Sequence, residues 1–239
     1  MRITNFLACL TFFFTSCIAI LGHVPQTTVQ RKILRNAEGT LQNLLTRNKN
    51  PIIGELISSA KALVIFPNLF KAAILAGGYY GQGIAVKRSE KSGKWGRPAF
   101  VKVLQASWGL QANIQNIEMV LVAFTRRGVK ALYQTHYHLE TGPKIKSGPT
   151  EKPLGVNLQE LVRASDIYIY SYPKEVFAEI SWKRTIITED EESNKLFYQR
   201  PISQRSILFS SNLKVPENGL LFIHNLNKIA PRVKLNKNS

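Results

Sequence analysis

The stretch ALVIFPNLFKAAILAGGYYGQGIAV, residues 62–86, contains long apolar runs, four glycines and a single charged residue, Lys71. Its segments ALVIF, KAAILA and YYGQGIAV have the branched and aromatic composition of β-strands bounded by proline or glycine. The same pattern returns in AFVKVLQ, SWGLQANIQ and EMVLVAFT. The sequence therefore predicts a mostly antiparallel sheet that begins near residue 62.

The glycines of this stretch raise the question of a phosphate-binding loop, since Gly78-x-x-Gly81-x-Gly83 is the dinucleotide fingerprint in reverse order. No helix follows that could receive a phosphate at its N-terminus. Glycines inside strands mark bulges, coiling or a close approach of backbones. We interpret Gly77, Gly78, Gly81 and Gly83 as structural glycines of a strongly curved, barrel-like sheet.

A later strand shows the alternation most clearly. In DIYIYSY, residues 166–172, Ile167 and Ile169 fall on one face, and Tyr168, Tyr170 and Tyr172 fall on the other. The following KEVFAEISW is predicted to pair with it. Short helices are expected near residues 127–133, 158–163 and 191–198, where apolar spacing becomes three or four. The fold class predicted is α+β, rich in β-structure.

An amphipathic helix is expected before the sheet, ending at Pro51, with a short second helix over residues 52–61. One stripe of the first helix is apolar and comprises Val29, Ile33, Ala37, Leu41, Leu44 and Leu45. Its polar flank is basic and carries Arg31, Lys32, Arg35, Arg47 and Lys49. Such a helix either lies at an anionic membrane surface or docks its stripe on the domain, and the sequence leaves both alternatives open.

The charge balance narrows the class of partner. The chain has 32 Lys and Arg against 15 Asp and Glu, a net charge of +17. Such an excess favours anionic partners, phospholipid headgroups or nucleic acid, although it also serves solubility.

The N-terminus has the features of an export signal, because Arg2 precedes an apolar run over residues 6–22. Residues 1–22 are therefore predicted to be a signal peptide or, alternatively, an N-terminal anchor, with acylation at Cys17 as a further alternative. Both cysteines, Cys9 and Cys17, lie in this segment, so disulfides are not expected in the rest of the chain. The predicted localisation is exported, periplasmic or secreted, and membrane-associated.

Residues 60–86 are followed in order by the blocks WGRPAF, SWGLQAN, IKSGP, FAEIS and EDEESNKLFY. Together these blocks resemble the SYLF domain family of lipid-binding proteins, and the resemblance covers residues 28–198. It implies a β-rich domain preceded by helices, binding to phosphoinositides or other anionic lipids and, in some fungal members, to actin. Residues 199–239 lie outside the resemblance and are predicted to form a basic C-terminal extension, a hairpin followed by a loose tail.

Charge, amphipathic helix and resemblance together predict a non-enzymatic protein that binds anionic phospholipid membranes. The alternative is a protein-interaction module, with actin as one partner. The candidate lipid-binding residues are Arg31, Lys32, Arg35, Arg47, Lys49, Lys61 and Lys71. Nucleic acid is not expected as a partner, because the export signal argues against it and no recognition motif is present.

Other chemistry has weaker support in the sequence. His136, His138 and Glu140 would share one face of a strand as a metal triad, but two histidines in an exposed strand are more often polar surface. The acids of TEDEES with Asn194 lack the spacing of a calcium loop, and a helix start explains them better. Nucleophile-elbow and Walker motifs are missing from the sequence, so we expect neither an enzyme nor a bound cofactor or metal.

Overall fold

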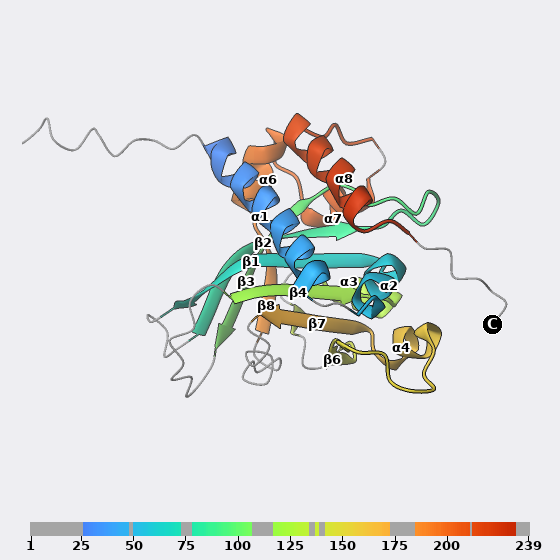
Figure 1. The fold of residues 1–239 in the computed structure, drawn as a ribbon. Helices are drawn as coiled ribbons and strands as arrows, with labels where there is room; N and C mark the ends of the chain where they lie inside the picture. Colours follow the sequence, from blue (N-terminus) through green and yellow to red (C-terminus); the bar gives the residue numbers. More distant parts are fainter. Residues whose placement is uncertain are drawn as a thin grey trace, which may run out of the picture.

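The computed structural model describes residues 26–47, 50–72, 78–106, 117–133, 137–138, 142–172, 185–210 and 212–232. These residues form an α+β fold in which helices pack on a strongly curved sheet (Figure 1). The helices are α1 (Gln26–Arg47), α2 (Ile52–Ser59), α3 (Arg126–Ala131), α4 (Leu158–Ala164), α6 (Glu191–Tyr198), α7 (Gln204–Phe209) and α8 (Glu217–Ile229). The strands are β1 (Ala62–Ala72), β2 (Gly78–Lys87), β3 (Ala99–Ala106), β4 (Ile117–Ala123), β5 (Tyr137–His138), β6 (Ile145–Ser147), β7 (Ile167–Tyr172) and β8 (Thr185–Glu189).

The strands form one sheet in the order β5-β8-β3-β2-β1-β4-β7-β6. Every neighbouring pair is antiparallel except β6 and β7, which run parallel. The prediction of a curved, mostly antiparallel sheet is confirmed. Among the described residues β5 and β6 are open edges, so this sheet is curved but does not close.

The first strand is longer than the sequence suggested. We predicted two strands separated near Pro67, whereas β1 runs through this proline as one strand. Its pairing with β2 shifts register between Ile65 and Asn68, which is the mark of a bulge. A bulge leaves backbone groups out of the ladder, and proline is tolerated there because it has no N–H to donate.

Two glycines of β2 lie opposite this bulge, where β1 comes too close to leave room for a side chain. A Cβ atom built on Gly81 would lie 2.8 Å from the carbonyl oxygen of Asn68. One built on Gly83 would lie 2.6 Å from Cδ1 of Phe66. At both positions a side chain would collide with β1, which is a structural reason for glycine. Gly78 begins β2, and Gly77 lies outside the described residues.

The sheet is buried on both faces. One face carries Tyr168 and Tyr170 of β7 in the core under α1, α2, α6 and α8. The other carries Ile167 and Ile169, which pack with Val129 of α3. The alternation predicted for this strand is confirmed.

The apolar stripe of α1 belongs to the first of these cores. Ile33, Ala37 and Leu41 are buried, and Leu44 packs against them, whereas Val29 near the start of the helix is exposed. The helix therefore docks on the sheet, and this decides between the two alternatives that the sequence left open. The alternative in which this stripe inserts into a membrane is wrong for the folded domain, because protein already covers the stripe.

The C-terminal part differs from the prediction. The hairpin is wrong, since residues 204–209 and 217–229 form α7 and α8. Ile207, Phe222 and Leu226 from these helices are buried in the same core as α1. The spacing of three and four residues between Gly219, Phe222 and Leu226 is the helical signal that could have identified α8.

Three further helices lie near the positions that the sequence predicted. The helix predicted over residues 191–198 is confirmed in full, and those near 127–133 and 158–163 are α3 and α4. The strands predicted in SWGLQANIQ and KEVFAEISW, together with residues 1–25 and 233–239, lie outside the described residues. Within the described part of the chain, no helix combines the length and the apolar character needed to cross a bilayer.

Candidate functional site

The outer side of α1 is basic. Arg31, Lys32 and Arg35 are exposed, because docking of Ile33 and Ala37 turns the opposite side of the helix to the sheet. No ion pair involves these three cations among the described residues. Their charges therefore face solvent without a carboxylate to neutralise them.

Helix α8 lies alongside α1 (Figure 1). Asn225 Nδ2 of α8 donates a hydrogen bond of 3.2 Å to Glu38 Oε2 of α1, and burial of Glu38 at this contact raises its pKa. One helical turn before these residues, α1 carries Arg35 and α8 carries Leu221. The contact thus brings the basic side of α1 next to α8.

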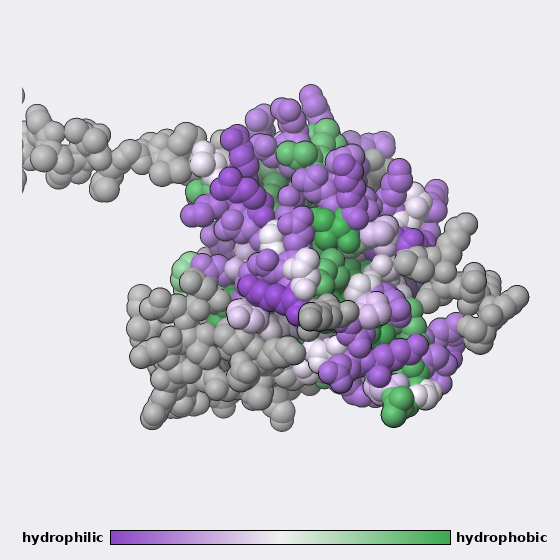
Figure 2. Space-filling view, viewed as in Figure 1, coloured by the Kyte–Doolittle hydropathy of each residue, from purple (hydrophilic) through white to green (hydrophobic). Residues whose placement is uncertain are grey.

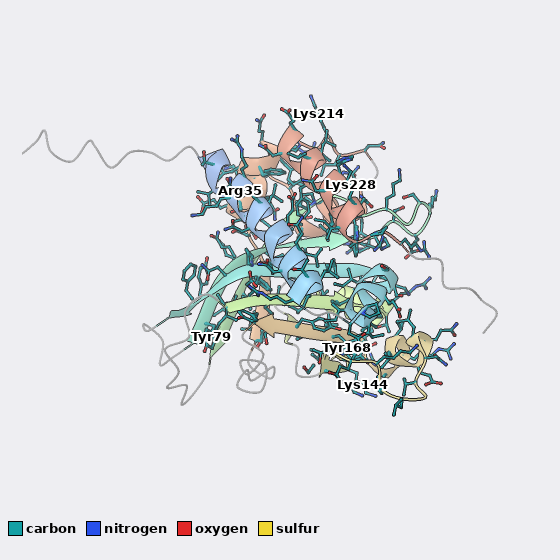
Figure 3. The ribbon with its side chains drawn as sticks, in the orientation of Figure 1. Arg35, Tyr79, Lys144, Tyr168, Lys214 and Lys228 are labelled. Atoms are coloured by element: carbon teal, nitrogen blue, oxygen red, sulfur yellow. The ribbon has the colours of Figure 1, made fainter. Side chains whose placement is uncertain are left out.

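The outer side of α8 combines apolar and basic groups. Since Gly219, Phe222 and Leu226 face the core, Leu220 and Leu221 point outward, with 56% and 59% of their surfaces exposed. Figure 2 shows apolar surface over α8 surrounded by hydrophilic surface. Figure 3 shows Arg35, Lys214 and Lys228 on this side of the molecule. We call this region the α1–α8 surface, and it comprises Val29, Arg31, Lys32, Arg35, Lys214, Leu220, Leu221 and Lys228.

Arg47 lies elsewhere and has a different environment. Its Nη1 is 2.7 Å from Glu118 Oε2 on β4, and its guanidinium lies over the Tyr172 ring at 3.8 Å from the centroid. Thr40 and Asn43 of α1 also donate to this glutamate. Arg47 therefore helps to hold the end of α1 on the sheet.

Of the remaining candidates, Lys61 lies apart from the first three. Lys49 lies outside the described residues, as does the side chain of Lys71 in β1. Lys61, between α2 and β1, is exposed and lines a separate cavity of about 730 Å³. The other cations of that cavity were not among the predicted lipid-binding residues, and they are Lys87, Arg88, Arg126, Lys130 and Arg232.

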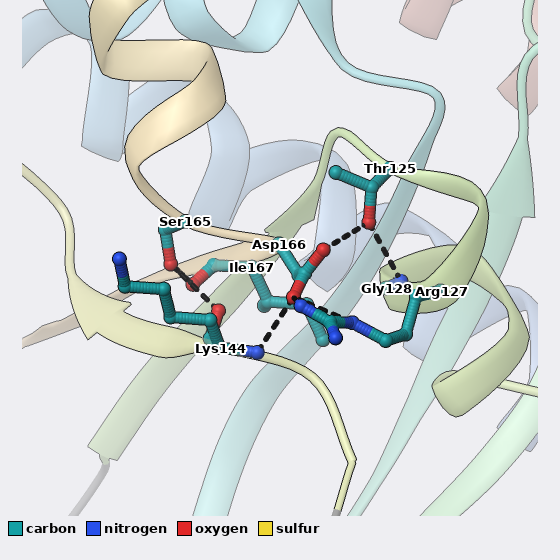
Figure 4. Close-up of polar contacts among 7 residues, drawn as sticks. All are labelled: Thr125, Arg127, Gly128, Lys144, Ser165, Asp166 and Ile167. Atoms are coloured by element: carbon teal, nitrogen blue, oxygen red, sulfur yellow. Dashed lines mark hydrogen bonds and ion pairs between the residues drawn. The ribbon is translucent and has the colours of Figure 1, made fainter.

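A buried aspartate positions the helix that supplies two of these cations (Figure 4). Asp166 accepts hydrogen bonds from Thr125 Oγ1, from Arg127 Nε at 2.9 Å and from the backbone N–H of Lys144 at 2.7 Å. Burial alone would raise the pKa of Asp166, but these hydrogen bonds and the Arg127 charge outweigh burial and lower it. The carboxylate is therefore ionised at neutral pH.

The same network caps α3. Thr125 accepts a hydrogen bond of 3.0 Å from the backbone N–H of Gly128, as expected of an N-cap residue. With its first turn tied to Asp166, α3 presents Arg126 and Lys130 to the cavity. A contact remote in sequence thus sets the direction of two exposed cations.

The acidic segment considered for calcium has a structural role. Asp190 is the N-cap of α6, accepts from the backbone N–H of Ser193 at 3.2 Å and pairs with Lys102 at 3.0 Å. Asn194 is buried and exchanges hydrogen bonds with the backbone of Phe100. The helix-start interpretation is confirmed. No cluster of metal-ligating side chains occurs among the described residues, and His136 and Glu140 lie outside them.

Comparison with known proteins identifies the family. The family model described as "Ysc84: Las17-binding protein actin regulator" matches residues 104–229, more than half of the chain. The chain belongs to the Ysc84 family. This is the SYLF family that the sequence blocks resemble, and the Ysc84 match extends through α8, so it includes most of the segment beyond residue 198.

Relatives in yeasts are similar over about two thirds of the chain. LAS seventeen-binding protein 3 of Saccharomyces cerevisiae is 27% identical over 168 residues, covering 68% of this chain and 35% of the relative. Protein YSC84 of the same organism is 27% identical over 167 residues, covering 67% of this chain and 34% of the relative. An SH3 domain-containing protein of Schizosaccharomyces pombe is 26% identical over 159 residues, covering 64% of this chain and 36% of the relative. The chain thus matches about a third of the length of these relatives.

Proposed function

We propose that this protein binds anionic phospholipid membranes through the α1–α8 surface, without catalysing a reaction. The observation that supports the proposal is a cluster of exposed cations on α1, Arg31, Lys32 and Arg35, beside two exposed leucines on α8. Among the described residues these cations form no ion pair. Cations near an anionic bilayer each contribute about 1 kcal/mol, and exposed leucines add the burial of apolar surface at the headgroup boundary.

The role proposed for α1 is electrostatic, since its apolar stripe packs in the core. Leu220 and Leu221 of α8 supply the apolar contact instead, because they are held on the outside by the burial of Phe222 between α8 and the sheet. We also propose that the protein is exported, on the basis of the apolar segment over residues 6–22.

Vesicle sedimentation tests the proposal with three variants of the whole mature protein. Replacing Arg31, Lys32 and Arg35 by Gln is expected to weaken binding to vesicles rich in phosphatidylglycerol by about 100-fold at low salt. A charge-matched control replaces Lys146, Lys152 and Lys195, which are exposed on other parts of the fold, and is expected to bind nearly as well as the wild type.

The dependence of binding on salt separates the electrostatic contribution of the cations from the apolar contribution of the leucines. Binding by the wild type is expected to weaken between 0.1 M and 1 M salt, as the Debye length falls from about 10 Å to about 3 Å. The double variant Leu220→Ser with Leu221→Ser is expected to lose the part of vesicle binding that persists at high salt. Equal loss of binding in the cationic variant and in its control would reject the α1–α8 surface, and absence of binding by the wild type at low salt would reject the lipid function.

A second candidate is binding of a protein partner of the actin cytoskeleton. It is favoured by the description of the family and by the name of the yeast relative that binds LAS seventeen. Cosedimentation with filamentous actin tests it, and retention of actin binding in the α1–α8 variants would assign the partner to another surface.

A further inference from the structure

A second basic site lies apart from the α1–α8 surface, at the cavity of about 730 Å³ that Lys61 lines. Its wall is formed by α2, β2, α3, α4, α7 and the residues that follow α8. Among the residues that the structure describes, the cationic lining residues are Lys61, Lys87, Arg88, Arg126, Lys130 and Arg232, and the acidic one is Glu90. No ion pair neutralises these cations within the described part of the chain. The cavity is therefore strongly positive, which concentrates anions from solution.

Arg88 is the buried member of this set, with 5% of its surface exposed. It donates to Ala60 O at 3.1 Å, at the end of α2, and to Ala230 O at 3.1 Å, at the end of α8. It also donates to Gly93 O at 2.8 Å. Carbonyl groups at helix C-termini carry partial negative charge and stabilise a cation. Arg88 is thus held in the cavity wall by carbonyl groups, and no carboxylate of the described residues forms an ion pair with it.

A second arginine lies close to the first. Burial and, to a smaller extent, the charge of Arg232 lower the pKa of Arg88 to about 10, so that Arg88 is still protonated at neutral pH. Arg232 packs on the turn after β2, where a Cβ atom on Gly93 would lie 2.5 Å from its Cδ. Gly93 has φ of +70°, so glycine both permits this turn and makes room for the arginine. Because Arg88 and Arg232 are close together and both positively charged, binding of an anion between them and the lysines of the cavity is favoured.

Apart from Ser58, Ser59 and Ser89, the rest of the lining is apolar or aromatic. It includes Phe124, Val129, Tyr133, Val162 and Phe209. Lys87 Nζ lies 5.0 Å from the centroid of the Phe209 ring. Ligand pockets of this size are mostly apolar with a few convergent polar groups. The combination suits an anion that carries an organic part better than it suits a bare inorganic ion.

We propose that this cavity binds the phosphomonoester group of a small organic molecule or of a lipid headgroup, with Lys61, Arg126 and Lys130 contacting the phosphate oxygens. A phosphomonoester carries nearly two negative charges at neutral pH and accepts several charge-assisted hydrogen bonds, which matches lysine and arginine donors converging from different elements. The site is independent of the proposed membrane binding, because it shares no residue with the α1–α8 surface.

Titration calorimetry of the whole mature protein with phenyl phosphate tests the site in solution. We expect saturable binding at one site at low salt, weaker binding of benzenesulfonate, which has the same ring and a single charge, and a dissociation constant at least about tenfold higher in Arg126→Gln and in Lys130→Gln. Both residues are exposed, and Lys152→Gln serves as the matched exposed control with unchanged binding.

Vesicles containing phosphatidic acid test the lipid source of the same group. If vesicle binding is lost in the double variant Lys61→Gln with Lys130→Gln, and phenyl phosphate gives no signal, the phosphomonoester is that of a lipid headgroup. Binding of phenyl phosphate that depends on the same residues assigns it to a soluble molecule. The proposal is overturned if both probes ignore the cavity variants, or if benzenesulfonate binds as tightly as phenyl phosphate. Variants of the α1–α8 surface should leave binding of phenyl phosphate intact, so the two proposals fail separately.

Discussion

The guanidinium of Arg88 lies over the indole ring of Trp95, 3.8 Å from the ring centroid, and both side chains donate to the carbonyl oxygen of Ala230. Trp95 Nε1 donates at 2.8 Å. Stacking on an aromatic ring stabilises a buried cation, and the shared acceptor ties the end of α8 to the turn that follows β2. This pair connects the C-terminal helix to the sheet.

Replacing Arg88 by Met is expected to lower the free energy of unfolding by about 3 kcal/mol, because buried carbonyl acceptors lose their donor. Chemical denaturation measures the change. Lys91→Met, at an exposed position of the same turn, is the control and should be near neutral. A variant as stable as the wild type would contradict the structural role assigned to Arg88.

Replacing Asp166 by Asn is expected to cost about 1 to 3 kcal/mol at neutral pH, because the charge-assisted hydrogen bonds from Arg127 and Thr125 are weakened or lost. The pKa of this carboxyl is lower in the folded protein than its ordinary value of 3.8. Its contribution to stability is therefore complete above that value and declines as the pH falls through the folded-state pKa. The difference in stability between wild type and variant, measured by denaturation from pH 7 to pH 2, should shrink on the acid side. A difference that stays constant with pH would argue against an ionised Asp166.

Replacing Gly83 by Val is expected to destabilise the fold by about 1 to 3 kcal/mol through overpacking against Phe66 and the backbone of β1. The same change at Gly39 of α1, where a Cβ atom has open space, is the control and should cost far less. Thermal unfolding compares the two. If the Gly83 variant were fully stable, the close approach at the bulge would not be what requires glycine.

Replacing Leu41 by Ser is expected to lower stability by about 3 kcal/mol, because a fully buried side chain of α1 is truncated and a hydroxyl takes its place. Val29→Ser, at an exposed position of the same stripe, should have little effect on the melting temperature. Equal effects at both positions would mean that α1 is not docked as described.

The apolar run over residues 6–22 predicts that the mature protein starts between residues 19 and 23. Mass spectrometry of the protein from its native source measures this directly. A soluble form that retains Met1 would show that the segment is not processed.

The sequence by itself determined the elements whose pattern is local. Alternation in β7 assigned Ile167 and Tyr168 to opposite faces, because successive side chains of a strand point to opposite sides. The acids and the apolar spacing of α6 located that helix to the residue. The blocks that resemble the SYLF family pointed to the family that the comparison then identified.

Tertiary structure decided which surfaces stay free. Whether the stripe of α1 faces lipid or core depends on the sheet beneath it, and the exposure of Leu220 and Leu221 depends on how α8 packs. The basic cavity joins Arg88 to the end of α8, across 142 positions in the chain. Local patterns specify backbone conformation over a few turns, whereas burial and charge clustering arise from contacts between distant segments. For this reason the sequence predicted the sheet and the basic helix, and the folded structure alone showed which cations gather at one site.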